Sequence, residues 1–587
     1  MMNLTMASFV WLVSCLWLLM FCSTSIPKAY AMPPQSPVKC DATGCILRSA
    51  YGVWNDRKEC WVQKTIYPTT EEELRLAVAD ANQKKFKVKI VTGSSHSIPK
   101  LACPGTKSTK NSVLISTAKY NSGIKVDVES LTVTADSGVG LRDLINKVED
   151  AGLSLVTSPY WEGLSIGGVI STGAHGSSWW GKGGAVHDHV VGLSLVVPAK
   201  ESEGYAKVIQ LDSRNQIFNA AKVSIGMLGA ISKVQLSLEP GFKRSITNIY
   251  NDDSHFEDEF IGLAQKHEFA DITWYPSKHT TIYRQDDRVP LNSSGNGIND
   301  YFGFQSFSVL TSSAARSSEE VLEGTRNVNG KCRMADTVVG FMKLIANGLR
   351  NNNLGFTGYP VVGCQGKMQT SGSCLYTSKL DNLSTCVWDP RIKGAFCFET
   401  AAIISASKFR NFIQDVKKLR DLKPEHLCGA DIYYGFLMRF VKASDAYLGQ
   451  PEDSVVVQFT YYRANEASTP RLNQDVWEEV EQIAFFKYGA RPHWAKNRNL
   501  VFLGVQQKYP NFGKFLKAKK QLDPENMFSG DWSDEILSGN EAAKAEGCAM
   551  EGLCICSEDK HCNPSKGYLC KPGIIYNKAR VCRFSTS

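Results

Sequence analysis

The sequence predicts an α+β protein with more than one domain, and three observations lead to this prediction. At 587 residues the chain is too long for a single compact core. Strand-like runs alternate with amphipathic helical patterns over the first 240 or so residues. Six of the 18 cysteines lie between Cys548 and Cys582, so we expect a small disulfide-rich tail at the end of the chain.

Local patterns justify the elements of the first domain in order. Thr70 precedes the acidic run 71–73 and apolar residues at helical spacing, which is the pattern of a capped amphipathic helix. A second helix is expected at 141–149 because its apolar residues fall on one side. Strands are expected at 88–91, 113–115, 124–128, 131–135, 190–197, 208–211 and 231–238.

We place the end of this first domain at residue 241, beside Pro240. The pattern from 242 to 530 is mixed, with candidate strands at 271–274, 400–404 and 455–461, and predicts a second α+β domain. Residues 531–587 are expected to form a linker and the tail.

The first residues have the features of a secretory leader. Residues 9–21 form an apolar run without charge, and Ala29-Tyr30-Ala31 has the small-x-small form of a signal-peptidase site. The run is shorter than the roughly 18 residues that a membrane-spanning helix needs. We therefore predict a signal peptide over residues 1–31 and secretion; the alternative is a retained anchor. Stable membrane insertion is not expected.

The overall composition is that of an ordinary globular protein, with 43% hydrophobic and 21% charged residues. The net charge of +8 is mild and no Lys/Arg block stands out, so nucleic acid is not an expected partner. Asn292 and Asn382 each begin an Asn-x-Ser sequence, which predicts two potential glycosylation sites.

The cysteines predict disulfides. Without Cys15 and Cys22 of the leader, 18 − 2 = 16 cysteines are left, an even number that suits an oxidising compartment. Residues 32–61 form a cysteine-bearing N-terminal segment. In the second domain we expect bridges that fasten long loops, made by Cys332, Cys364, Cys374, Cys386, Cys397 and Cys428.

The tail cysteines have two interpretations. Disulfides are favoured in a secreted chain, and the pairing of six cysteines cannot be fixed from sequence. The alternative is a zinc site made by Cys554, Cys556, His561 and Cys562. No other metal site is predicted.

Two glycine-rich loops suggest a bound phosphate group. Residues 93–97 offer closely spaced backbone N–H groups, which suit a pyrophosphate. Residues 164–177 repeat the pattern on a larger scale, and the hydroxyls of Ser171 and Thr172 can donate to phosphate oxygens. Neither loop has the spacing of the Rossmann fingerprint or of a P-loop. Either loop alone is also compatible with a flexible surface loop.

Together, these loops, the segment 137–144 and the strand at Ile231 resemble the PCMH-type FAD-binding domain of the vanillyl-alcohol oxidase superfamily. The sequence His493-Trp494-Ala495-Lys496 looks like the His-Trp-x-Lys signature of the sugar-1,4-lactone oxidoreductases. Residues 523–528 are similar to that family's closing motif. The resemblance covers roughly residues 62–528, and the leader and tail resemble the plant L-gulonolactone oxidase branch.

The resemblance implies a two-subdomain FAD-binding domain at 62–241 and a substrate-cap domain at 242–530. His96 matches the position at which several relatives attach the flavin covalently, which implies a covalent bond here; the alternative is a histidine that only hydrogen-bonds in the loop. Ile231 would contact the adenine. The residues expected to hold FAD are Gly93, Ser94, Ser95, His96, Ser97, Gly138, Gly167, Gly168, Ser171, Thr172, Gly173, Gly176 and Ile231. For His175, His187 and His189, structural roles are expected.

The resemblance also implies catalytic roles for Lys496, His493 and Glu399. Lys496 would stabilise negative charge on the reduced flavin, and His493 would hydrogen-bond the substrate or help remove its hydroxyl proton. The alternative is a surface His and Lys around a buried Trp494. Glu399 sits where relatives carry a substrate-binding carboxylate, but the arginine that some of them have two residues later is Ala401 here.

The implied activity is hydride transfer from C2 of a sugar lactone to FAD, giving a 2-keto lactone that becomes ascorbate, with oxygen as the acceptor and hydrogen peroxide as a product. The small-molecule partners are therefore the lactone and oxygen. Two alternatives stay open: an alditol or oligosaccharide oxidase on the same fold, and a secreted binding protein that has lost catalysis.

Overall fold

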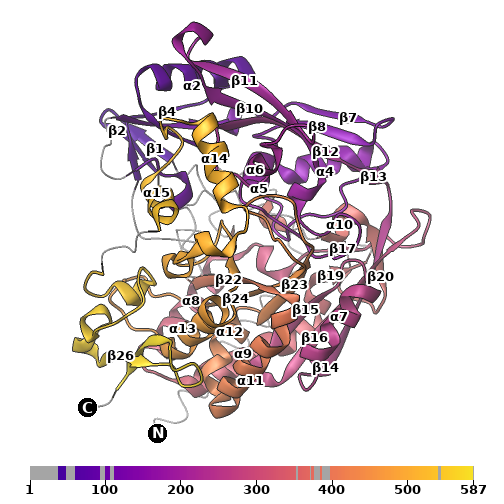
Figure 1. Cartoon of the computed structure of the whole chain (residues 1–587). Helices are drawn as coiled ribbons and strands as arrows, with labels where there is room; N and C mark the ends of the chain where they lie inside the picture. The colour runs from indigo at the N-terminus through magenta and orange to yellow at the C-terminus, as the bar shows by residue number, and fades with distance from the viewer. Residues whose placement is uncertain are drawn as a thin grey trace.

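The computed structural model describes residues 38–47, 60–92, 99–105, 111–351, 354–369, 372–375, 384–386, 397–539 and 544–585. The predicted signal peptide, the loop Gly93–Ser97 with His96, and the potential glycosylation site at Asn382 lie outside the described residues. Figure 1 shows the N-terminal domain in indigo and purple above a large sheet whose strands run from magenta to orange. The yellow tail lies beside this sheet.

The N-terminal domain begins with a small parallel sheet. Its strands follow the order β4-β6-β5, and helix α2 (Glu71–Gln83) connects β4 to β5. The helix begins where the sequence predicts, because Thr70 Oγ1 accepts a hydrogen bond from Glu73 N at 3.1 Å. A three-stranded antiparallel sheet precedes it, in the order β1-β2-β3. The strands are β1 (Val38–Asp41), β2 (Gly44–Leu47), β3 (Cys60–Val62), β4 (Lys64–Ile66), β5 (Lys87–Val91) and β6 (Ser112–Ser116).

The second half of this domain is a five-stranded antiparallel sheet in the order β11-β10-β12-β8-β7. Helices α4 (Leu141–Asp150) and α5 (Ile166–Ser171) bury their apolar side chains in its core, which contains Leu144 and Val169. The strands are β7 (Ile124–Asp127), β8 (Thr132–Asp136), β10 (Val190–Pro198), β11 (Ala206–Asp212) and β12 (Ala230–Ser237).

The cap domain is built on an eight-stranded antiparallel sheet in the order β20-β14-β16-β15-β23-β24-β22-β25. Alternation along each strand separates its two faces. Phe436 and Phe459 point toward the helices and stack on each other, with ring centres 4.6 Å apart. The strands are β14 (Lys243–Asp252), β15 (Asp271–Tyr275), β16 (Thr280–Val289), β20 (Val361–Cys364), β22 (Cys397–Ser405), β23 (Phe436–Val441), β24 (Ser454–Tyr462) and β25 (Arg491–Pro492).

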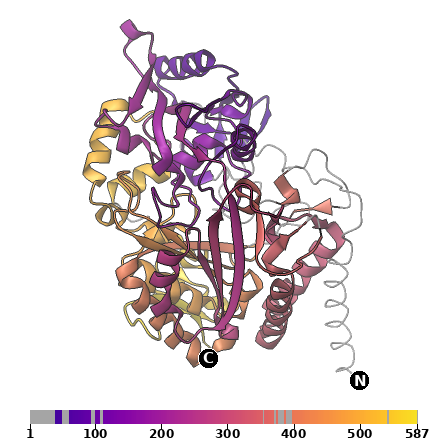
Figure 2. The same cartoon turned by 90° about the vertical axis from the view of Figure 1, so that its right-hand side faces the viewer.

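Helices cover the face of this sheet that is turned away from the N-terminal domain, as Figure 2 shows. Trp477 of α13 packs on Phe459, and Phe409 of α11 packs on Phe260 of α7. The opposite face, which carries Glu399 and Arg439, is turned toward the N-terminal domain. The cap helices are α7 (Phe256–Lys266), α8 (Val309–Gly324), α9 (Val328–Leu344), α11 (Ala406–Leu422), α12 (Cys428–Ile432) and α13 (Gln474–Gln482).

After the cap, the chain returns to the N-terminal domain through α14 (Phe512–Leu522) and α15 (Asp531–Ser538), the labelled orange helices beside the indigo strands in Figure 1. Val88 N of β5 donates to Met527 O at 2.8 Å, and Phe528 belongs to the same core cluster as Leu74 and Val88. The segment around Met527 and Phe528, which lies within the predicted cap domain 242–530, therefore packs as part of the N-terminal domain.

The tail is a disulfide-bonded unit with a hairpin of β26 (Tyr568–Pro572) and β27 (Arg580–Phe584). Its six cysteines form three disulfides, Cys548–Cys554, Cys556–Cys570 and Cys562–Cys582. The predicted disulfide-rich tail is therefore confirmed, and the zinc interpretation is wrong because the thiols are bonded to one another.

Four more disulfides are present among the described residues: Cys40–Cys45, Cys60–Cys103, Cys332–Cys428 and Cys374–Cys386. The expectation that Cys364 and Cys397 also form bridges is wrong, since both thiols are free. Cys397 is buried on β22, two residues before Glu399 and on the same face of the sheet. Among the described helices, none is long and apolar enough to span a bilayer.

Candidate active site

A cavity of about 510 Å³ lies between the N-terminal domain and the open face of the cap sheet. Most of the described residues predicted to hold the cofactor line its N-terminal wall: Gly167, Gly168, Ser171, Thr172 and Ile231. All three predicted catalytic residues line the opposite wall: Glu399, His493 and Lys496. The fold thus brings together residues that lie more than 160 positions apart in the chain.

Gly138, Gly173 and Gly176 do not line this cavity among its described residues. Glycine is needed at two of these positions for close packing: a Cβ atom at Gly138 would lie 2.0 Å from Thr117 O, and one at Gly176 would lie 2.3 Å from Thr157 Oγ1. These two glycines therefore allow close packing of the segments that support the cavity wall.

The hydroxyls of Ser171 and Thr172 are engaged within the chain. Ser171 Oγ donates to Gly167 O at 2.7 Å, and Thr172 Oγ1 donates to Gly168 O at 2.9 Å. Both bonds reach back four residues along α5, a usual arrangement for serine and threonine in helices. In this structure the two hydroxyls therefore stabilise the glycine-rich turn, and their predicted role toward a phosphate stays a prediction.

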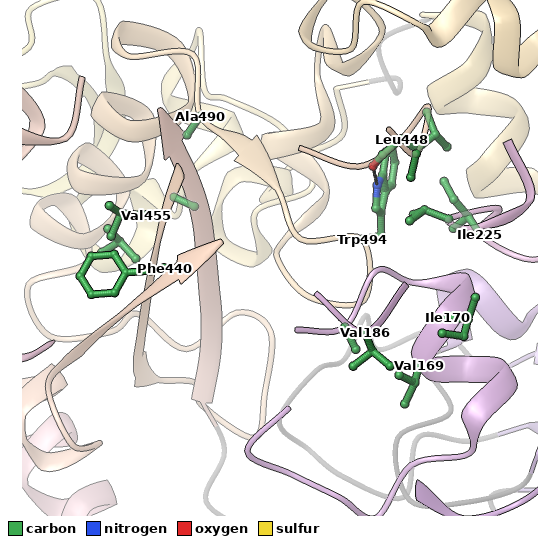
Figure 3. Packing of buried hydrophobic residues seen from close by; sticks show 14 of the residues in the cluster. Val169, Ile170, Val186, Ile225, Phe440, Leu448, Val455, Ala490 and Trp494 are labelled. Atoms are coloured by element: carbon green, nitrogen blue, oxygen red, sulfur yellow. Dashed lines mark hydrogen bonds between the residues drawn. The ribbon is translucent and has the colours of Figure 1, made fainter. Parts of the chain in front are cut away.

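Asn497 fixes the loop that carries His493 and Lys496 to β22. Its side-chain Oδ1 accepts from Ala401 N at 2.9 Å, and its Nδ2 donates to His493 O at 3.2 Å. Trp494 is buried and donates from Nε1 to Leu448 O at 3.0 Å. Figure 3 shows Trp494 beside Leu448, with Ile225 of the N-terminal domain opposite. Trp494 is thus an anchor of the loop.

The part-buried Lys496 and the buried Glu399 form an ion pair on the cavity wall. Lys496 Nζ donates to Glu399 Oε1 at 2.5 Å and to Gln458 Oε1 at 2.9 Å. Burial lowers the pKa of Lys496 and raises the pKa of Glu399, while the ion pair opposes both shifts. The second carboxylate oxygen, Glu399 Oε2, has no hydrogen-bond partner among the described residues. Glu399, a residue of the cavity lining, therefore has one buried acceptor atom to spare.

The two histidines of the cavity are held neutral. Burial and the neighbouring cations Arg439 and Lys496 place the pKa values of His175 and His493 well below the usual range. His493 Nδ1 accepts from Ala495 N at 3.2 Å, so its proton is on Nε2 and that atom is a donor. His175 Nδ1 is bonded to Gly176 O at 2.9 Å, which leaves Nε2 as an acceptor with no partner among the described residues. His175, for which the sequence predicts only a structural role, thus also belongs to the cavity lining.

Arg439 was missed by the sequence analysis. It lies on β23, is buried, and lines the cavity. Its Nη1 donates to His175 O at 3.0 Å and its Nη2 donates to Gln458 Oε1 at 2.9 Å. No local motif marks Arg439, since only the strand pairing across β23, β24 and β22 places it near Glu399. Some relatives are expected to carry an arginine at the position of Ala401. Here Arg439 supplies a guanidinium group to the cavity wall from a different strand.

The walls fit a large cofactor with polar and apolar parts. Ser137 Oγ is buried without a partner among the described residues and lies on the cavity wall with the glycine-rich turn. The glycines on one side let the backbone come close to a ligand, and the other side carries charged groups. This combination suits a flavin dinucleotide bound across the domain interface. The wall with Ser137, Gly167 and Gly168 would hold it on the N-terminal side, and Lys496 would face it from the cap. When bound, FAD supplies a two-electron acceptor for a hydride.

Comparisons with known proteins identify the class of protein. A family model described as FAD binding domain matches residues 62–201, one described as D-arabinono-1,4-lactone oxidase matches 398–536, and one described as L-gulonolactone oxidase 2-like, C-terminal domain, matches 545–584. Solved structures share the fold: a solvent-stable cholesterol oxidase aligns over 86% of this chain and 99% of its own, with a TM-score of 0.64 and 15% identity. The predicted α+β fold class is therefore confirmed, and the chain is an FAD-dependent oxidoreductase.

Curated relatives narrow the class further. L-gulonolactone oxidase 3 of Arabidopsis thaliana is 60% identical over 94% of this chain and 95% of the relative. L-gulonolactone oxidase 5 of Arabidopsis thaliana is 46% identical over 95% of each chain, and L-gulonolactone oxidase of Bos taurus is 26% identical over 82% of this chain and 97% of the relative. The chain belongs to the L-gulonolactone oxidase family.

Proposed function

We propose that the protein oxidises L-gulono-1,4-lactone, or a close aldonolactone, at C2 to a 2-keto lactone that becomes L-ascorbate. Oxygen is the proposed electron acceptor, and hydrogen peroxide is the second product. The observation that carries this proposal is the Lys496–Glu399 pair: both residues line the cavity with the glycine-rich turn, and Glu399 Oε2 has no hydrogen-bond partner among the described residues.

Each polar group of the cap wall has a distinct task in this proposal. Glu399 Oε2 accepts the hydrogen bond of the C2 hydroxyl and orients it. His493, neutral and protonated on Nε2, donates to a ring or carbonyl oxygen of the lactone. Lys496 holds Glu399 in place and adds a positive charge where negative charge develops during oxidation. Glu399 and His493 are buried and Lys496 is part-buried, which strengthens these interactions by excluding water.

A second candidate substrate is a longer polyol or an oligosaccharide. The cavity is also lined by the aromatic residues Tyr301, Phe304 and Tyr434, which favour a larger carbohydrate ligand. Aromatic faces are common in carbohydrate sites because they pack against the apolar side of a sugar ring.

Anaerobic mixing tests the proposal. Purified holoenzyme is combined with L-gulono-1,4-lactone while the visible flavin absorbance is followed, and we expect bleaching. Readmitting air should restore the colour and release hydrogen peroxide. A 2-deoxy-aldonolactone, which has no C2 hydroxyl, serves as the matched control and should not bleach the flavin. Bleaching by alditols or oligosaccharides alone would move the assignment to the second candidate, and no bleaching by any of them would contradict an oxidase role.

We also propose that residues 1–31 are removed and that the protein is secreted, on the basis of the leader and the seven disulfides of the described residues. Peptide mapping of protein from a secreting host should give a mature N-terminus at Met32. Retention of the leader in the purified protein would contradict this. The same peptides should report glycan at Asn292, which is exposed at the end of β16.

A further inference from the structure

Arg439 carries a buried positive charge that no carboxylate neutralises directly. Within the described part of the chain, its hydrogen bonds go to two uncharged acceptors, His175 O and Gln458 Oε1. Its guanidinium carbon also lies 5.2 Å from the ring centre of Tyr160. A buried cation without an anionic partner is costly, so its presence on a cavity wall indicates a ligand.

The nearby carboxylates are already committed to other cations. Glu399 is paired with Lys496, and this pair contributes no net charge whether the shared proton lies on the amine or on the carboxylate. Asp271 accepts from Tyr160 Oη and lies 3.9 Å from Arg284 Nε. Asp286 is bonded to Arg244 and Arg284. The two aspartates thus offset the two other arginines, and Arg439 gives this cluster one excess positive charge.

Gln458 holds the two cations of the wall side by side. Its Oε1 accepts from Arg439 Nη2 at 2.9 Å and from Lys496 Nζ at 2.9 Å. This arrangement fixes both groups on the same face of the sheet, beside Glu399, whose Oε2 has no hydrogen-bond partner among the described residues. Cationic donors and a hydroxyl acceptor therefore stand next to each other, which suits a ligand with both a negative charge and hydroxyl groups.

We propose that Arg439 and Lys496 form an anion subsite of the substrate cavity, whose ligand is a small polyhydroxylated monoanion. Two anions with the carbon skeleton of the lactone have this chemistry: the open-chain aldonate formed by lactone hydrolysis, and the ionised enediol form of a 2-keto lactone. The inference rests on the proposed function and deepens it, because it makes the enzyme subject to inhibition by its own product or by opened substrate.

Ligand binding to the oxidised holoenzyme tests the subsite. Sodium L-gulonate is titrated at constant ionic strength while the visible flavin spectrum is followed, and sodium L-ascorbate is tested as a competitive inhibitor of lactone oxidation. The neutral comparator is a 2-deoxy-aldonolactone. In Arg439→Gln, we expect the affinity for the anions to fall about tenfold, which corresponds to about 1.4 kcal/mol, while the comparator changes less than about twofold. Arg439→Lys should keep most of the anion affinity, since it keeps the charge.

The control variant is Arg420→Gln, which removes a buried guanidinium bonded to Asp253 and away from the cavity lining. FAD content and the unfolding temperature of each variant show whether it is folded. Equal weakening of anions and comparator in Arg439→Gln would mean that the side chain only shapes the cavity, and would overturn the proposal, as would the absence of binding by both anions in the wild type. Binding of only one of the two anions by the wild type would support the subsite and show which of them is its ligand.

The two proposals fail separately. Binding of L-gulonate by an enzyme whose flavin is not reduced by the lactone would contradict the proposed function and support the subsite. Reduction by the lactone without binding of either anion would support the function and overturn the subsite.

Discussion

Lys100 Nζ donates a hydrogen bond to Lys496 O at 3.1 Å, and a second one to the neighbouring Asn497 O at 2.5 Å. Lys100 belongs to the short helix α3 (Pro99–Ala102), which directly follows the predicted pyrophosphate loop. The ammonium group also lies 5.0 Å from the ring centre of Phe502. One buried side chain therefore connects the cofactor side of the molecule to the loop that carries the candidate catalytic lysine.

We predict that Lys100→Ala slows flavin reduction by the lactone about tenfold while FAD stays bound, since losing a charge-assisted hydrogen bond costs about 1.5–3 kcal/mol and loosens the Lys496 loop. Stopped-flow absorbance gives the rate. Lys100→Arg is the matched control and should retain more activity because it keeps donors and charge. An unchanged rate in Lys100→Ala would remove this residue from the positioning of Lys496.

The ion pair of the cavity gives a pH prediction. Because the pKa of Glu399 is raised by burial, its carboxylate is lost as an acceptor at a higher pH than an exposed glutamate would be. The rate of flavin reduction should therefore fall on the acid side with an apparent pKa above the ordinary glutamate value. Glu399→Gln should be slower at every pH and lack this acid limb. Persistence of the limb in Glu399→Gln would assign it to another group.

Lys496→Ala should slow flavin reduction by roughly 100-fold or more, because a preorganised cation next to the developing charge is worth about 2.7–4 kcal/mol. FAD content should change little, since the glycine-rich wall would still hold the cofactor. The matched control is Lys508→Ala, which removes another part-buried lysine whose ammonium is hydrogen-bonded to Phe485 O and Ala490 O in the described structure. A normal reduction rate in Lys496→Ala would exclude it from the mechanism.

The proposed covalent link at His96 has a direct test. Acid precipitation of His96→Ala should release yellow cofactor, whereas the wild-type protein should keep it in the pellet. Equal release from both proteins would contradict the covalent bond and leave the histidine as a hydrogen-bonding residue of the loop.

Gly552→Ala should destabilise the tail and disturb the active-site loop. Gly552 has φ +67° and an added Cβ would lie 2.4 Å from Arg498 Cδ. Its carbonyl oxygen accepts from Leu500 N at 2.9 Å, just after the loop that carries Lys496. We expect a loss of about 1–3 kcal/mol in unfolding free energy, measured by denaturant titration, together with slower flavin reduction. Gly324→Ala, on the solvent side of α8 with open space around it, is the control.

Local features of the chain could be predicted from the sequence better than the composition of the cavity wall. The helix at Thr70 and the strands at 190–197 and 455–461 follow from caps and periodicity, which depend on neighbouring residues. The motif with His493 and Lys496 was visible for the same reason. Arg439 and Gln458 were not visible, because their place depends on the register of β22, β24 and β23. Cys364 and Cys397 show the same limit, since an even number of cysteines does not tell which of them meet.

The disulfide-bonded tail supports the loop that carries Lys496, so the state of its cysteines can affect the reaction in the cavity. Glu479 of α13 accepts from Ile574 N, Ile575 N and Tyr576 N, and Glu478 accepts from Cys582 N at 3.0 Å. Arg498, which follows the Lys496 loop, is bonded to Glu478 and Glu481. Because the tail follows the two larger domains in the chain and holds its shape through three disulfides, this support is completed only after the tail has been made and oxidised. Maturation of the enzyme is therefore tied to thiol oxidation, so a full-length chain produced under reducing conditions should bind flavin and yet turn over poorly.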